Sequence, residues 1–230
     1  MRRKLKLKRG LQQGGAALEF ALSLMVLVPL FLGVIGLGLS MLLQMQTVQV
    51  ARDAGHMFAR SINFTLLGNQ QILSFIAGPL GLSAGSGTTG TAGSGNAVLL
   101  LSTVRYMDVS ACGLAGFTSL NSHGVPTGCT NYGDWVFSQR LVIGNNTLRT
   151  SNLGTPPASI VSTTDGTITI TNQAVNTGDV ATITGFNPWN STTGDGLPSG
   201  QWVYVSEAAA TGFNMPPFSN GTMTYAQLYF

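Results

Sequence analysis

The chain has 230 residues, of which only 8% are charged, and its formal net charge at pH 7 is +3. Residues 1–14 contain six of the eleven Lys and Arg residues, so the other five and the eight acidic residues give residues 15–230 a net charge of −3. The basic character is therefore confined to the N-terminus, and no second basic cluster indicates a nucleic-acid-binding surface. This length allows one membrane anchor and one domain of ordinary size.

A long apolar segment follows the basic N-terminus. Residues 20–50 contain no charged residue, and the most apolar part, residues 20–43, exceeds the ~20 residues that a helix needs to span a bilayer. The apolar region of a secretory signal peptide is shorter, typically about 7–15 residues. Because positive residues stay on the cytoplasmic side, we expect a single-pass protein with its N-terminus in the cytoplasm and its C-terminal part outside.

Glu19 lies at the start of this apolar segment, with no other charged residue between Arg9 and Arg52. A carboxylate at the centre of a bilayer costs about 2.5–3.5 kcal/mol or more, so we expect the Glu19 carboxylate to have a positively charged partner. Cleavage after Gly14 would supply one, because the new amino group of Gly15 would lie four residues from Glu19 or face the Glu19 of a neighbouring subunit. The same residues also fit an uncleaved signal anchor that carries a Glu near its start.

The run Gly14-Gly15-Ala16-Ala17-Leu18-Glu19-Phe20 resembles the processing site of type IV prepilin-like proteins. It looks most like that of the TadE-like minor pseudopilins of tight-adherence (Flp-type) pilus systems. The resemblance covers about residues 9–62 and implies that a prepilin peptidase removes residues 1–14 as a leader peptide. Many family members read GAALVEF, whereas the second glycine here allows two positions for the cut. Cleavage after Gly14 places Glu19 at +5, and cleavage after Gly15 places it at +4.

The resemblance also implies how the protein would work. Glu19 would neutralise the new amine of an adjacent subunit, next to Phe20, and the N-terminal helix would contact other pilins or pseudopilins in the inner membrane. These features make the chain resemble a minor pseudopilin that takes part in pilus or pseudopilus assembly for adhesion or secretion. The alternative is an uncleaved single-pass envelope protein with an extracytoplasmic domain that binds a ligand or partner.

The apolar helix is expected to continue beyond the membrane, over residues 15–62 in all. The continuation contains no proline, and Arg52, His56 and Arg60 recur every four residues as one polar stripe. Arg52-Asp53-Ala54 also resembles the helix continuation of TadE-like proteins. Apolar residues on the other faces are expected to pack on a neighbouring molecule: Val50, Ala54, Met57 and Phe58.

The remainder reads as a connector over residues 63–96 and a β-rich extracytoplasmic domain over residues 97–230. The connector includes a short helix near residues 70–77 and a Gly/Ser/Thr-rich linker. The fold class is therefore α+β, a long N-terminal transmembrane helix followed by a small antiparallel β-rich domain. Strands are predicted for residues 97–106, 135–143, 166–172, 180–184, 201–206 and 223–230.

Cys112 and Cys129 are the only cysteines, and in an oxidising compartment they are predicted to form a disulfide. No cofactor, metal site or enzymatic activity is expected. Ser122, His123 and Asp134 could make a triad on paper, but no nucleophile motif surrounds them. A membrane-anchored hydrolase or lectin-like enzyme is therefore the weakest of the alternatives.

Overall fold

The computed structural model describes residues 7–85, 88–90, 94–183, 200–217 and 219–230, which form two compact units. The first unit comprises residues 1–42 and 212–222, and the second comprises residues 43–211 and 223–230. Helix α1 (Leu7–Ala59) contributes to both units. Besides its part of α1, the first unit contains an antiparallel hairpin of β4 (Asn214–Met215) and β5 (Ser219–Asn220).

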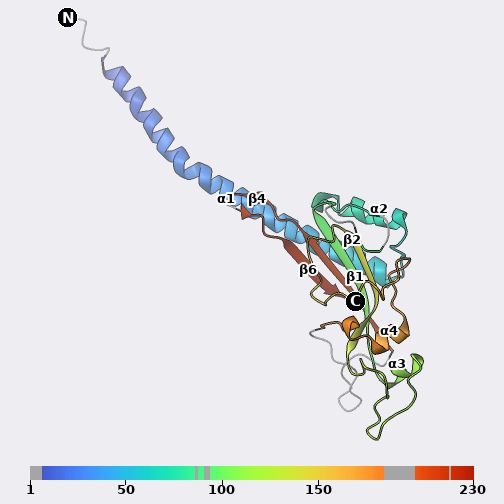
Figure 1. Cartoon of the computed structure of the whole chain (residues 1–230). Coiled ribbons are helices and arrows are strands. Elements are labelled where there is room, and N and C mark those ends of the chain that lie inside the picture. The colour runs from blue at the N-terminus through green and yellow to red at the C-terminus, as the bar shows by residue number, and fades with distance from the viewer. Residues whose placement is uncertain (1–6, 86–87, 91–93, 184–199, 218) are drawn as a thin grey trace, which may run out of the picture. The chain divides into compact units, whose positions relative to one another are not determined.

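A four-stranded antiparallel sheet forms the centre of the second unit (Figure 1). Its strand order is β2-β1-β3-β6, so the long strand β1 has a neighbour on each side. The α+β fold class predicted from the sequence is confirmed. The bounds of the strands are β1 Ala97–Tyr106, β2 Trp135–Gly144, β3 Trp202–Ala210 and β6 Thr224–Tyr229.

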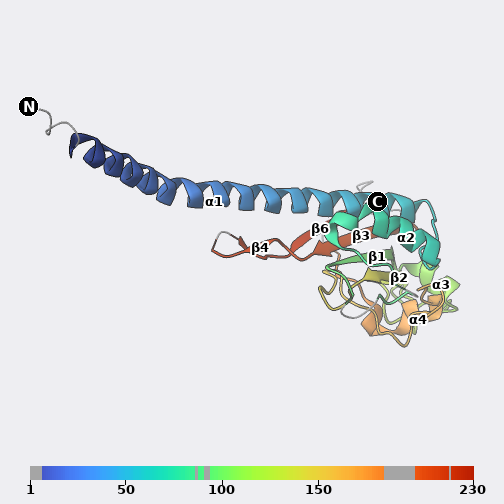
Figure 2. The ribbon, with the colours of Figure 1, turned by 90° about the horizontal axis from the view of Figure 1, so that it is seen from above.

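Two helical segments cover one face of this sheet. They are residues 43–59 of α1 and helix α2 (Leu67–Ile76), which Figure 2 shows on the side of the sheet opposite α4 (Ile170–Val175). Val50, Ala54 and Phe58 of α1 are buried against the sheet, so the prediction that they pack on a neighbouring molecule is wrong. The core beneath the helices also includes Leu73, Leu99, Leu101, Leu141, Ile143 and Ala208.

Helix α1 ends at Ala59, three residues before the predicted end. Ser61 adopts the left-handed conformation with φ of 63°, and its N–H donates to the Phe58 carbonyl at 2.9 Å. The Ile62 N–H donates to the Met57 carbonyl at 3.1 Å, which completes a Schellman motif. The sequence gives no warning of this end, because serine occupies the position where glycine is usual.

Two predicted strands are replaced by other structure. Residues 166–172 form isolated bridges at Thr167 and Ile168 and then enter α4, because the Thr169 side chain caps that helix. After the short helix η2 (Thr177–Asp179), only Val180 pairs, in a single bridge to Val136 of β2. The end of the predicted 180–184 strand lies outside the described residues.

The disulfide joins Cys112 in helix α3 (Val109–Leu114) to Cys129 in the following loop. The Asp108 side chain caps α3 by accepting a hydrogen bond of 2.8 Å from the Ala111 N–H. The two half-cystines are buried with Met107 and Val136, so the disulfide belongs to a small core at one end of β1 and β2.

Gly55 allows the ring of Phe230 to lie against α1. A Cβ atom on Gly55 would overlap that ring, which also makes an edge-to-face contact with His56 at 4.7 Å between centroids. The backbone of Phe230 is paired with Tyr204 by two hydrogen bonds of 2.9 and 3.1 Å. The backbone of Phe230 is therefore held in place, so a Cβ on Gly55 would force the ring into another rotamer and away from this contact.

We expect Gly55→Ala to lower the free energy of unfolding by about 1–3 kcal/mol through overpacking, despite the higher helix propensity of alanine. Urea unfolding of the full chain in non-ionic detergent, followed by tryptophan fluorescence, measures the change. Gly68→Ala in α2 is the matched control, since a Cβ there meets nothing within 4 Å. The cost of Gly55→Ala should shrink in a Phe230→Ala background; an equal cost in both backgrounds would contradict the clash.

Candidate functional site

The residues predicted for processing and assembly all lie within α1. Gly14 and Gly15 are helical, and a Cβ on Gly15 would meet no atom within 4 Å. Glu19 and Phe20 are both exposed, and the Phe20 side chain is 65% accessible. In the described part of the chain, the Glu19 carboxylate has no hydrogen bond or ion pair, although its backbone carbonyl accepts from Ser23 Oγ at 2.9 Å.

The apolar side chains in the first part of α1 are exposed, as expected for a helix that lies in a non-aqueous environment. Among the described residues, one helix is long and apolar enough to cross a membrane, over Gly15–Ala59. In its most apolar 18-residue window only 6% of the residues are buried. Large side chains such as Met25, Phe31 and Leu37 are more than half exposed, so the fold itself does not bury this apolar surface.

The second half of α1 has two distinct sides. Arg52 and His56 are exposed, as the predicted polar stripe requires, and so is Arg60 in the turn just after the helix. On the buried side, Thr47 shares a hydrogen bond of 2.8 Å with Thr224 of β6. The Gln44 side-chain amide donates to the Tyr225 carbonyl at 3.1 Å. Polar contacts between α1 and β6 therefore begin near the point at which one side of α1 becomes buried.

Residues 14–56 match the family described as TadE-like protein. The chain carries a TadE-like segment. The match begins at Gly14, contains Glu19 and Phe20, and ends at His56. The resemblance identified from Gly14–Phe20 is thereby confirmed, and the family connects the chain with Tad pilus systems.

Most of the second unit, which contains the four-stranded sheet and is called the sheet-bearing unit below, lies outside the TadE-like match. No curated protein and no solved structure matches the chain. Evidence on the function of that unit therefore comes from its own residues.

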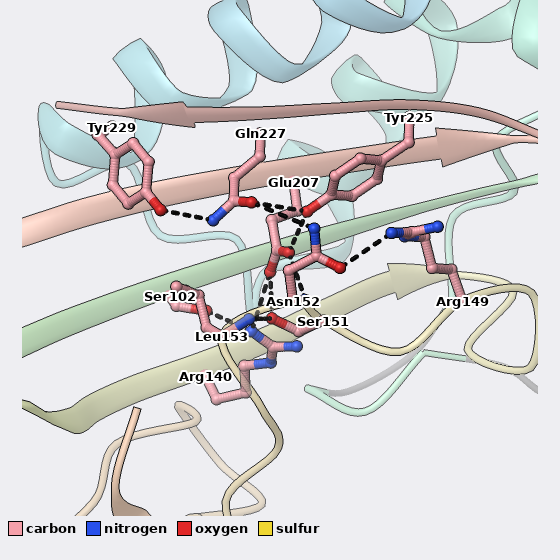
Figure 3. Close-up of polar contacts among 10 residues, drawn as sticks. All are labelled: Ser102, Arg140, Arg149, Ser151, Asn152, Leu153, Glu207, Tyr225, Gln227 and Tyr229. Carbon is pink, nitrogen blue, oxygen red and sulfur yellow. Dashed lines mark hydrogen bonds and ion pairs between the residues drawn. The ribbon is translucent and has the colours of Figure 1, made fainter. Parts of the chain in front are cut away.

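A buried polar network occupies the sheet face opposite the TadE-like helix. The strand register places Ser102 of β1 directly opposite Arg140 of β2, and Glu207 of β3 directly opposite Gln227 of β6. Side chains alternate between the faces of a sheet, and the helix-facing core uses Leu101, Leu141 and Ala208, the neighbours of these residues in sequence. The network thus lies on the other face, as Figure 3 shows.

Glu207 is the centre of this network. Its carboxylate accepts hydrogen bonds from Ser151 Oγ, from the Asn152 N–H at 2.9 Å and from the Tyr225 hydroxyl at 2.5 Å (Figure 3). It also forms an ion pair with Arg140 Nη1 at 3.6 Å, and both side chains are at least 95% buried. Arg140 Nη1 donates to Ser102 Oγ at 2.5 Å.

Burial changes the protonation behaviour of the partners of Glu207. Desolvation lowers the pKa of the Arg140 guanidinium, and the negative charge of Glu207 opposes that change. Burial, together with the hydrogen bond to Glu207, raises the pKa of the Tyr225 hydroxyl. Tyr225 therefore remains a neutral donor to the carboxylate at physiological pH.

Sequence reasoning missed Arg140 and Glu207. Each is the one charged residue of its strand, and that is the signal that could have revealed them. Their pairing could not be predicted from the sequence, because it depends on β1 lying between β2 and β3. The Ser122, His123 and Asp134 triad is not assembled: Ser122 Oγ lies 3.3 Å from His123 Nδ1, but within the described residues His123 forms no hydrogen bond or ion pair with Asp134.

We expect Glu207→Gln to lower the free energy of unfolding by about 3–5 kcal/mol, because Arg140 would remain buried without a counter-charge. The measurement is urea unfolding of the full chain in detergent. Asp53→Asn, which neutralises an exposed acid, should change stability by less than about 0.5 kcal/mol. Replacing both partners, as in Arg140→Met with Glu207→Leu, should recover most of the loss. A Glu207→Gln protein as stable as the wild type would contradict this role.

Proposed function

We propose that the chain is a minor pseudopilin that inserts in the inner membrane, is cleaved by a prepilin-type peptidase and takes part in pilus or pseudopilus assembly for adhesion or secretion. The observation that carries the proposal is the TadE-like match, which starts at Gly14 and includes Glu19 within an exposed apolar helix. The basic N-terminus and the positive-inside rule support a cytoplasmic N-terminus and a periplasmic or extracellular sheet-bearing unit.

The environment of Glu19 supports a role between subunits. No other charged residue lies between Arg9 and Arg52, and the carboxylate has no partner among the described residues. A carboxylate in hydrocarbon needs a counter-charge. Cleavage after Gly14 creates one as the amine of Gly15, and the same amine on an adjacent subunit would pair with Glu19 during insertion. The proposed partners are accordingly the peptidase and other pilins, and the role needs no cofactor or catalytic residue.

We expect mass spectrometry of protein expressed with its native peptidase to find a mature N-terminus at Gly15. Gly14→Ile should abolish processing, because a branched side chain would obstruct the scissile bond, and should leave a precursor longer by residues 1–14. Gly10→Ile adds the same bulk within the leader and should be processed normally. A start at Ala16 would place the cut after Gly15, whereas an intact Met1 in the wild-type protein would contradict processing.

We expect Glu19→Ala to reduce incorporation into the sheared pilus or pseudopilus fraction at least ~10-fold while its amount in the inner membrane stays unchanged. The lost charge pair at the subunit contact is the physical reason. Ser23→Ala is the matched control, because it removes a side-chain contact one turn away without changing charge. Normal incorporation of Glu19→Ala would refute the proposed role of this carboxylate.

An uncleaved single-pass envelope protein with a ligand-binding outer domain is the second candidate. A cavity of about 330 Å³ in the sheet-bearing unit favours it. This alternative predicts an intact N-terminus and no effect of Glu19→Ala, so the two experiments above separate the candidates.

A further inference from the structure

The sheet-bearing unit contains a cavity beside the Glu207 network. It has a volume of about 330 Å³ and lies between strands β1 and β2 and the loops that follow β2. Small-molecule sites generally have volumes of about 300–1,000 Å³, so this cavity is large enough for a small ligand. The residues that decide its chemistry are Arg140, Val142, Arg149, Pro156, Ala158 and Val161.

The charged groups at the cavity are both cations. Its lining includes Arg140 and Arg149 and, among the residues that the structure describes, no acidic residue. Glu207 pairs with Arg140 through Nη1, but the buried Nε of Arg140 has no hydrogen-bond partner in the described part of the chain. This unpartnered donor belongs to a side chain that is 95% buried, and leaving a buried donor unpaired is costly.

Arg149 supplies the charge that is not neutralised. Its guanidinium lies 3.8 Å from the centroid of the Tyr225 ring and donates to Asn152 Oδ1 at 2.9 Å. Neither contact neutralises it, and among the described residues it forms no ion pair with a carboxylate. Since Glu207 balances only Arg140, the cavity keeps one net positive charge and favours an anion.

The remaining wall is largely apolar. Leu100 and Val142 form the sheet side, and Pro156, Ala158 and Val161 contribute from the loops, while six Ser or Thr residues and Asn146 add hydroxyl and amide groups. An inorganic anion would leave this apolar surface in contact with water. The combination of guanidinium donors and an apolar wall instead fits a molecule that has one carboxylate and a compact hydrocarbon body.

We propose that this cavity binds a small organic carboxylate, with the carboxylate held by Arg149 and Arg140 and the hydrocarbon body against Val142, Pro156 and Val161. The inference goes beyond pilus assembly and does not depend on it. Arginine suits this task because its planar guanidinium matches the two oxygens of a carboxylate.

Benzoate is a suitable probe because it combines one carboxylate with a compact ring. We expect saturable binding to the full chain in non-ionic detergent micelles at pH 7, measured by saturation-transfer NMR, with a Kd on the order of 10 mM, as ordinary ligand efficiency gives for so small a molecule. Benzyl alcohol, a neutral analogue of similar shape, should bind at least ~5-fold more weakly.

Two variants locate the binding site. Ala158→Phe should fill the cavity and abolish saturable benzoate binding, whereas Ser159→Phe adds the same ring at an exposed residue outside the lining and should leave it unchanged. Urea unfolding of both variants checks that each is folded.

A second pair of variants tests the charge. Arg149→Gln should weaken benzoate binding at least ~5-fold without changing that of benzyl alcohol, and Arg149→Lys should weaken it less. The proposal is overturned if benzoate and benzyl alcohol bind equally, if binding persists in Ala158→Phe, or if Arg149→Gln binds benzoate like the wild type. Because these measurements require no pilus, they can fail while the pilin proposal stands, and the reverse also holds.

Discussion

The packing of residues 43–59 of α1 against the sheet is the constraint on which the sheet-bearing unit depends. Val50, Ala54 and Phe58 recur on one side of the helix and meet Leu99, Leu101 and Ala208 of the sheet. Burying apolar surface at ~25 cal/mol per Å² is the main favourable term available to such a unit.

One helix thus meets two different requirements along its length. In the apolar segment before Leu43, large side chains are exposed, and the fold offers them no core. From Thr47 onward, small and apolar residues face the sheet while charged residues face away. The change occurs within the TadE-like match, which ends at His56. The family segment therefore includes both the apolar helix and the part that anchors this chain's own sheet.

The sequence was sufficient for features that depend on local pattern. The apolar run with Glu19 led to the helix and the family, and the apolar stretches 97–106 and 135–143 became β1 and β2 almost residue for residue. Local pattern failed where a cap or a single backbone conformation decided the outcome. Thr169 turned an alternating Thr/Ile segment into a helix, and Ser61 ended α1 without a glycine.

Features that depend on strand order could not be predicted at all. Arg140 and Glu207 are 67 residues apart and lie on strands separated by β1, so no spacing rule connects them. The cavity likewise needs loops placed over the sheet before its two arginines share one wall.

The two faces of the sheet are chemically separate, and this separation has a consequence for how the protein can vary. Among the described residues, the centre of the helix-facing side is apolar or small, whereas the opposite side contains the Glu207 network and the cavity together with two further apolar clusters. Substitutions in the cavity loops, such as those at Ala158 and Ser159, leave the contacts of Val50 and Phe58 untouched. Energetic effects at such distant, unconnected sites are close to additive. Substitutions that change the cavity lining are therefore expected to leave the packing of the helix against the other face of the sheet unchanged.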